Sequence, residues 1–359
     1  MKILQVITGI RRAAGTSVFC GELANALVGS GCQVEVAVCA PTMKDAYPLD
    51  SAITVLNITE AISRISRGVL HPDIVHIHGL WSPPLHQMSK CARANKIPVV
   101  WSTHGMTAPW SMRHKWWKKW FAWHLYQRRD LSSAKILHVT TEQEAGWNRK
   151  LGLKNVQVVV PLGTYLPPIN AHQTCRSCEY LRVLFVGRIY PVKGLMNVVH
   201  AAALLKDVHV RFRVVGPDQA GHKAELLKEA ARLGVSELFE WAGPKYGEEL
   251  RKEYEECDML ILPSFTENFG AVVVDALAHG KPVLASRFTP WKVLSEEKCG
   301  WWVSNDPHSL ASTLSDIQLL DVSELSDMGN KGRKLIKQSY VWDVVCDSMK
   351  SAYKQLEKI

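Results

Sequence analysis

Short apolar runs alternate with amphipathic stretches along most of the chain. In the first half, continuous runs rich in β-branched residues occupy Ile3 to Ile7, Val34 to Val38, Ile74 to Ile77, Val99 to Trp101, Ile136 to Val139 and Val156 to Val160. Runs of this kind are typical of strands in a parallel sheet that is covered on both faces. Helical stretches such as Ser17 to Val28 and Leu85 to Ala94 separate them. We therefore predict a doubly wound α/β domain over residues 1–165.

The alternation lapses at residues 166–180 and then resumes. Pro167, Pro168 and the polar residues after them predict a linker. New apolar runs follow at Leu181 to Val186, Val210 to Val215, Leu238 to Trp241, Met259 to Leu262 and Val283 to Ala285. They predict a second Rossmann-like domain over 181–340, with the strand C-termini of the two domains facing each other across a cleft. A terminal helix within 341–359 is long enough to return to the first domain.

Length and composition favour a two-domain globular protein. The 359 residues are too many for one ordinary core, and the formal charge of +9 predicts an acidic partner such as a nucleotide phosphate, a nucleic acid or an anionic membrane. The N-terminal apolar run is too short for a signal peptide, and no run approaches the roughly 18 residues that span a bilayer. We therefore expect a cytoplasmic protein. Nine cysteines without a framework suit a reducing compartment, and Cys175 and Cys178 are interpreted as surface thiols.

Charged residues follow two strands of the predicted second domain. Arg188 and Lys193 lie in the loop after Leu181 to Val186, and Glu267 lies between the run Met259 to Leu262 and a new helix. Cations beside a helix N-terminus suit a diphosphate, and an acid beside them can accept hydrogen bonds from hydroxyls. Nucleotide sugars carry both groups. The alternative without a functional role is that the two cations are solvated loop residues and that the acid is present because acids are favoured near helix N-termini.

These motifs, taken in order, resemble family 4 of the retaining GT-B-fold glycosyltransferases. The similarity is carried by Gly187-Arg188, Lys193-Gly194, His104-Gly105, the stretch Pro263-Ser-Phe-Thr-Glu-Asn-Phe-Gly270 and an acid at Asp275. It implies two Rossmann-like domains, a last helix that returns to the first, and retaining transfer from a nucleotide diphosphate sugar. These residues do not decide the base, for which we prefer UDP. The implied acceptor is a lipid-linked or membrane-proximal glycan in cell-surface polysaccharide synthesis.

The resemblance also implies residue roles. The catalytic set would be His104, Arg188, Lys193 and Glu267, and the donor-binding set Gly15, Asn268, Phe269, Gly270, Asp275, Gly243 and Tyr246. Asp275 departs from the usual Glu, and Ala14 replaces a usual glycine before the first helix. The chain has no Asp-x-Asp to hold a metal on the diphosphate, so we expect no metal and no cofactor beyond the nucleotide sugar.

A basic, tryptophan-rich run stands apart from these motifs. Residues 113–129 contain no acid, six Lys or Arg and four Trp. Basic helices with Trp favour the bilayer interface. We predict a membrane-facing or acceptor-facing surface formed by Lys115, Trp116, Trp117, Lys118, Lys119 and Trp120. The alternative is that the aromatic side chains pack onto the first domain and the lysines are solvated.

Two other functions compete with the transferase. A nucleotide-sugar epimerase of the same architecture would act without an acceptor. A non-catalytic protein that binds nucleotide sugar or anionic lipid would bind without turnover. The presence of His104, Arg188, Lys193 and Glu267 favours a catalytic protein instead. Nucleic-acid binding is disfavoured, because the basic residues form no known reading motif.

Overall fold

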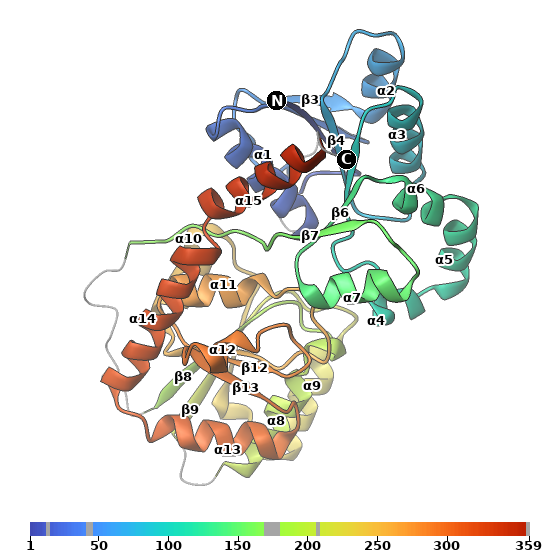
Figure 1. Cartoon of the computed structure of the whole chain (residues 1–359). Coiled ribbons are helices and arrows are strands. Elements are labelled where there is room, and N and C mark those ends of the chain that lie inside the picture. Colours follow the sequence, from blue (N-terminus) through green and yellow to red (C-terminus); the bar gives the residue numbers. More distant parts are fainter. Residues whose placement is uncertain (12–14, 41–45, 169–179, 206–208, 357–359) are drawn as a thin grey trace. The chain divides into compact units, whose positions relative to one another are not determined.

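The computed structural model describes residues 1–11, 15–40, 46–168, 180–205 and 209–356 (Figure 1). The chain divides into two compact units, one formed by Met1–Gly163 with Trp342–Ile359 and the other by Thr164–Val341. Each unit is a parallel α/β sheet with helices, which confirms the predicted fold class. Most of the predicted linker, including Cys175 and Cys178, lies outside the described residues.

The first unit is built on a parallel sheet in the order β3-β2-β1-β4-β5-β6-β7. Its strands are β1 (Lys2–Ile7), β2 (Gln33–Val38), β3 (Thr54–Asn57), β4 (Ile74–His78), β5 (Val99–Ser102), β6 (Ile136–Val139) and β7 (Val156–Val159). Successive side chains of a strand point to opposite faces. Accordingly, Ile3 packs in one buried cluster and Leu4 in another, so both faces of the sheet are covered, as the continuous apolar runs predict.

This unit also contains helices, several of which contribute side chains to those two clusters. They are α1 (Gly15–Gly29), α2 (Ile58–Ser66), α3 (Pro83–Ala94), α4 (Pro109–Arg113), α5 (Trp116–Ala122), the π-helical turn η1 (Trp123–Gln127), α6 (Arg128–Ser133), α7 (Glu142–Lys150) and α15 (Trp342–Gln355). Helix α15 packs beside α1, where Trp342, Val345, Met349 and Tyr353 join the buried cluster that contains Phe19 (Figure 1). The last helix therefore completes the core of the first unit.

The second unit has a parallel sheet in the order β10-β9-β8-β11-β12-β13. Its strands are β8 (Leu181–Val186), β9 (Val210–Val215), β10 (Phe239–Gly243), β11 (Met259–Leu262), β12 (Val283–Ser286) and β13 (Gly300–Val303). Its helices are η2 (Pro191–Lys193), α8 (Leu195–Leu204), α9 (His222–Arg232), η3 (Ser236–Leu238), α10 (Gly247–Glu256), α11 (Ala271–Ala278), α12 (Val293–Glu296), α13 (Pro307–Gln318) and α14 (Val322–Ser339). Because β8 and β11 are neighbours, the loops that follow them emerge side by side.

Candidate active site

Three glycines end three neighbouring strands of the second unit. Gly187 follows β8, Gly216 follows β9 and Gly243 ends β10, all with positive φ. The Gly187 amide donates to the Val215 carbonyl, and the Gly216 amide donates to the Gly243 carbonyl at 2.9 Å. A Cβ on Gly216 would lie 1.9 Å from the Gly187 carbonyl oxygen, so only glycine fits. These close backbone approaches lie at the C-terminal ends of β8, β9 and β10, where the candidate site is found.

Lys193 and Glu267 are brought together by the loops after β8 and β11. Lys193 Nζ lies 2.5 Å from Glu267 Oε2, and both side chains are mostly buried. The Ser264 hydroxyl donates to the same carboxylate oxygen at 3.3 Å. The Phe265 amide donates to the Val192 carbonyl at 2.8 Å and ties the two loops to each other. The predicted cation and the predicted acid therefore form one ion pair.

The close contact of these loops depends on Gly194, which lies between η2 and α8. Its φ is 74°, and a Cβ here would lie 1.9 Å from the Pro263 carbonyl oxygen. That carbonyl also accepts a hydrogen bond from the side-chain amide of the buried Asn305. The Asn305 carbonyl in turn accepts from Asn197 Nδ2 at 2.6 Å. Asn305, a supporting residue that follows β13, was not predicted from the sequence, because no local pattern marks it.

Arg188 takes a different partner. Its guanidinium is exposed, and Nη1 donates to Gln219 Oε1 at 2.8 Å, in the loop after β9. Two backbone bonds join the same loops, from the Ile189 amide to the Pro217 carbonyl and from the Gln219 amide to the Ile189 carbonyl. Arg188 thus lies on the β9 side of the loop that carries Lys193.

The predicted donor-binding turn opens helix α11. Gly270 is the N-cap with φ 85°, and buried Phe269 packs edge-on against Trp291, whose indole N–H donates to the Phe269 carbonyl. Asn268 lies between Glu267 and Phe269, so the turn joins the acid to the helix N-terminus. Asp275 lies further along α11 and accepts a hydrogen bond at 3.0 Å from the Thr164 hydroxyl.

The predicted base loop is more open. Gly243 has φ 73°, with nothing within 4 Å of an added Cβ, and Tyr246 is 56% exposed at the N-cap of α10. Between them, Lys245 Nζ lies 2.6 Å from Glu253, so this lysine is already paired. An exposed aromatic ring beside an open glycine is a surface on which a planar base can stack.

His104 belongs to the first unit and has a strained backbone. It follows β5 with φ 48°, a region that non-glycine residues seldom occupy and that costs about 1–3 kcal/mol. Nε2 lies 3.0 Å from His78 Nδ1, and the ring packs edge-on against Phe19 of α1. Burial lowers the pKa of His104 to about 3, so the ring is neutral near pH 7. Gly15, which was predicted to bind the donor, is the first residue of α1, whereas Ala14 lies outside the described residues.

Glu144 holds the strained turn in place. This fully buried carboxylate, on α7, accepts from the Thr103 hydroxyl at 2.6 Å and from the Gly105 amide, on the two sides of His104. It also accepts from the Thr140 amide at 2.9 Å. Glu144 was not predicted from the sequence, because a glutamate in the first turn of a helix usually indicates only a favourable charge at the N-terminus.

The basic, tryptophan-rich run is helical but not one regular helix. Lys115 has φ 52° between α4 and α5, and η1 interrupts the helix further on. Five of its large apolar side chains are exposed, namely Trp116 at 64%, Trp117 at 51%, Trp120 at 52%, Phe121 at 55% and Leu125 at 77%. Among the described residues, no helix is long and apolar enough to cross a bilayer.

Two expectations for this run are corrected. The exposed side chains do not pack onto the first domain, although Trp123 does reach Trp81, with ring centroids 6.4 Å apart. Lys119 is not solvated like Lys115 and Lys118, because its ammonium donates to the Ser111 carbonyl and lies 5.7 Å from the Trp81 ring. Partial burial also lowers the pKa of Lys119.

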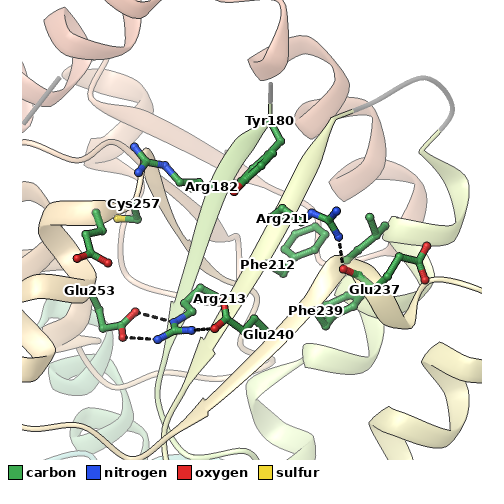
Figure 2. Close-up of a pocket in the computed structure, with 12 residues that line it drawn as sticks. Tyr180, Arg182, Arg211, Phe212, Arg213, Glu237, Phe239, Glu240, Glu253 and Cys257 are labelled. Carbon is green, nitrogen blue, oxygen red and sulfur yellow. Dashed lines mark hydrogen bonds and ion pairs between the residues drawn. The ribbon is translucent and has the colours of Figure 1, made fainter. Parts of the chain in front are cut away.

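A cavity of about 590 Å³ opens elsewhere in the second unit (Figure 2). Its lining includes Arg182 and Arg211, early in β8 and β9, and Arg213 further along β9, whereas the candidate site follows the C-terminal ends of these strands. Arg213 pairs with Glu253 at 2.8 Å and with Glu240, and Arg182 pairs with Asp258 at 3.0 Å. The cavity contains none of the predicted site residues, and its paired charges make it a poor anion site.

Two family models together match most of the chain. Residues 14–163 match the glycosyl transferase 4-like domain, and residues 177–335 match glycosyl transferases group 1. The chain belongs to the group 1 glycosyltransferases. The glycosyltransferase is therefore an enzyme that transfers sugars.

Curated relatives of the glycosyltransferase include D-inositol 3-phosphate glycosyltransferases. The protein from Corynebacterium efficiens is 27% identical over 321 residues, which cover 80% of this chain and 72% of the relative. The protein from Streptomyces griseus is 30% identical over 181 residues, which cover 47% of this chain and only 38% of the relative. The latter match thus spans well under half of that relative's length.

Solved structures show the same fold over the whole chain. Sucrose-phosphate synthase from Thermosynechococcus elongatus has a TM-score of 0.79 at 18% identity and covers 99% of each chain. The Anabaena protein HepE in complex with UDP has a TM-score of 0.79 at 15% identity and covers 99% of this chain and 100% of its own. At these identities the likeness concerns the fold alone, which is GT-B.

Proposed function

We propose that the glycosyltransferase moves a sugar from a nucleotide diphosphate sugar, with UDP as the nucleotide, to a lipid-linked or membrane-proximal glycan. The transfer retains the anomeric configuration, needs no metal and serves cell-surface polysaccharide synthesis. Arg188, Lys193 and Glu267 act on the donor, together with His104. The turn Asn268, Phe269 and Gly270, with Gly15, Asp275, Gly243 and Tyr246, completes the donor site.

The ion pair between Lys193 and Glu267 carries this proposal. Its cation ends η2, immediately before the N-cap of α8, and its acid lies three residues before the N-cap of α11. Negative charge develops on the departing diphosphate as the glycosidic bond breaks, so a cation and helix N-termini held in place in advance stabilise the transition state more than the ground state. The carboxylate orients the lysine and can accept hydrogen bonds from sugar hydroxyls.

The choice of UDP follows from similarity. HepE is described in complex with UDP and with UDP-glucose, and it shares the fold of this chain. The solvent-exposed Tyr246 and the open Gly243 are compatible with a stacked base.

A panel of nucleotides tests the donor. Thermal unfolding would be measured with UDP, GDP, ADP and CMP, each with and without a chelator. A ligand at about 100 times its Kd adds roughly 2.7 kcal/mol to the stability of the state that binds it. We expect UDP to give the largest shift, unchanged by chelator. A larger shift with another nucleotide would overturn the choice of base, and loss of the shift with chelator would overturn metal independence.

Lys193→Ala tests the catalytic assignment. Removing one oriented group that stabilises charge in the transition state typically lowers turnover about 10²- to 10³-fold, so we expect a loss of that size. The matched control is Lys292→Ala, which breaks the exposed ion pair with Glu296 at 2.9 Å and should leave turnover unchanged. Equal turnover in both variants would remove Lys193 from the mechanism.

The products separate the transferase from its alternatives. Proton NMR of the product should show a new linkage with the anomeric configuration of the donor, formed only when acceptor is present. A changed sugar formed from donor alone would identify an epimerase. An inverted linkage would eliminate the retaining mechanism, and binding without any product would indicate a non-catalytic protein.

The exposed aromatic surface supports the membrane part of the proposal. Lys115 and Lys118 flank Trp116 and Trp117, and all four side chains are exposed. Each lysine near an anionic surface is worth about 1 kcal/mol, so the two lysines supply roughly 2 kcal/mol, or about 30-fold in partitioning. This surface would place the enzyme on the inner face of the cell membrane.

Vesicle sedimentation tests this surface. Replacing Lys115 and Lys118 by Gln should weaken binding to phosphatidylglycerol vesicles about 30-fold, and salt should weaken wild-type binding in the same way. The control replaces the exposed Lys150 and Lys154 by Gln, which removes equal charge from the same unit. If wild type does not sediment with these vesicles at low salt, the acceptor is soluble.

A further inference from the structure

Four histidines lie together in the core of the first unit. His76 and His78 come from β4, His138 comes from β6, and His104 follows β5. The ring centroids of His76 and His78 are 4.1 Å apart, and those of His78 and His104 are 5.3 Å apart. Three of the rings are almost completely buried. Of the four, only His104 was predicted to have a role, so the role of the other three needs an explanation.

One continuous chain of hydrogen bonds joins these histidines. From one end, His138 Nε2 lies 2.9 Å from the Val160 carbonyl oxygen, and His138 Nδ1 lies 2.6 Å from the Ser102 hydroxyl. The Ser102 hydroxyl lies 2.6 Å from His76 Nε2, and His76 Nδ1 lies 2.6 Å from the Tyr353 hydroxyl of α15. Gln5 on β1 connects Tyr353 to His78 Nε2, and His78 Nδ1 meets His104 Nε2 at 3.0 Å.

The Val160 carbonyl fixes the direction of the first half of this chain. A carbonyl can only accept, so His138 Nε2 carries the proton, and in a neutral imidazole Nδ1 must then accept. Ser102 therefore donates to His138 and accepts from His76 Nε2. His76 Nδ1 in turn accepts from the Tyr353 hydroxyl, whose one proton is thereby used.

The direction then passes through Gln5 to His104. The Tyr353 oxygen accepts from Gln5 Nε2 at 3.4 Å, which turns the Gln5 carbonyl oxygen toward His78 Nε2. His78 therefore carries its proton on Nε2 and accepts at Nδ1 from His104 Nε2. His104 is left with an unprotonated Nδ1, for which the described residues show no hydrogen-bond partner.

Neutral rings are what this environment favours. Burial lowers the pKa of His76, His78 and His138, and that of His104 to about 3, with the neighbouring histidines adding to the shift for His76, His78 and His104. For His138, the Val160 carbonyl and Glu144 act in the opposite direction but do not reverse it. With every ring neutral, only one arrangement of protons satisfies all the links.

We propose that this chain of hydrogen bonds is a positioning device that fixes His104 as the Nε2–H tautomer and presents its Nδ1 as an acceptor for a hydroxyl of the donor sugar. Gln5, His76, His78 and Tyr353 are positioning residues that act through His104. The identity of the hydroxyl rests on the proposed function, whereas the tautomer does not.

Nitrogen-15 NMR of protein labelled at histidine tests the tautomers directly. Long-range proton–nitrogen correlations distinguish Nε2–H, Nδ1–H and doubly protonated rings, and single His→Asn variants assign the signals. At pH 7.5 we expect all four core rings as pure Nε2–H tautomers. An Nδ1–H tautomer at His104, or a doubly protonated core ring, would overturn the proposal, whether or not the enzyme transfers sugar.

Tyr353→Phe tests the transmission. It removes only the hydroxyl that orients Gln5, so the amide can turn over and His78 and His104 can exchange tautomers. We expect the His104 signal to move toward a mixture of tautomers and kcat to fall roughly 10-fold or more, as loss of a supporting partner does for functional histidines in metal sites. UDP affinity should be unchanged.

Tyr47→Phe is the matched control. It also removes a hydrogen-bonded tyrosine hydroxyl of the first unit, the one that donates to Glu22, but it lies outside the histidine chain. The His104 signal should not move in this variant. If the His104 signal does not move in Tyr353→Phe, the Tyr353 hydroxyl does not control the tautomer of His104. If the tautomers are as assigned but no sugar is transferred, the proposed function fails and the positioning device stands.

Discussion

Replacing Gly194 by alanine tests how closely the two loops of the donor site approach. The residue has φ 74°, and the added Cβ would lie 1.9 Å from the Pro263 carbonyl oxygen and 3.0 Å from Asn305 Nδ2. An alanine held at this φ costs about 1–2 kcal/mol. The overlap with a main-chain oxygen forces the loops apart and adds about 1–3 kcal/mol, as overpacking typically does. We expect a total loss of roughly 2–5 kcal/mol.

Gly234→Ala separates the two contributions. Gly234 has φ 71°, but nothing lies within 4 Å of its added Cβ, so this variant bears the backbone cost alone. Thermal unfolding of both variants would be followed by tryptophan fluorescence. At roughly 2–4 °C per kcal/mol for a unit of this size, Gly194→Ala should melt about 2–12 °C below Gly234→Ala. It should also bind UDP more weakly, because Lys193 is displaced from Glu267. Equal melting temperatures and equal UDP affinity would refute the close approach.

Three further predictions concern the acids and the histidines. Glu267→Gln should keep UDP binding but lower transfer steeply, and unchanged turnover would show that the carboxylate is not used. Asp275→Glu restores the side chain usual in the resembled family and should maintain or improve donor affinity in a UDP titration. The core histidines have lowered pKa values in the folded state. Their contribution to stability is therefore complete above the unfolded-state pKa of about 6.5 and is lost as pH falls below it. The loss is about 1.4 kcal/mol per pH unit for each ring that stays neutral in the folded state. His104→Asn removes one of these rings and should reduce that slope between pH 6 and pH 4, and Asn tolerates the positive φ at this position.

The strands buried on both faces could be predicted from sequence, as could the valine-rich edge strand β7. The run Leu181 to Val186 becomes β8 with the predicted bounds, because parallel-sheet packing requires continuous apolar side chains. Strand β3 (Thr54–Asn57) was missed, since it is a short edge strand with a mostly half-exposed pattern. Strand β13 (Gly300–Val303) is likewise a short, mostly half-buried edge strand, and it was missed for the same reason.

The candidate site was predictable only where local sequence carries the chemistry. Lys193 and Glu267 each follow a recognisable strand, although their contact depends on β8 and β11 being neighbours, which no local pattern specifies. The partners of His104 are not local at all. Gln5 and Tyr353 meet across 348 positions of sequence, and His76 and His78 look like ordinary strand residues until the register with β5 is known.

Helix α15 has a consequence for how the protein is made. Trp342, Val345, Met349 and Tyr353 fill the core of the first unit, yet the ribosome adds them after the whole of the second unit. Domains usually fold in the order of their synthesis. Here the second unit can finish folding first, while the earlier-made sheet waits with the α15 side of its core uncovered. The nascent first unit therefore exposes apolar surface for most of translation, which makes it a natural client for chaperones.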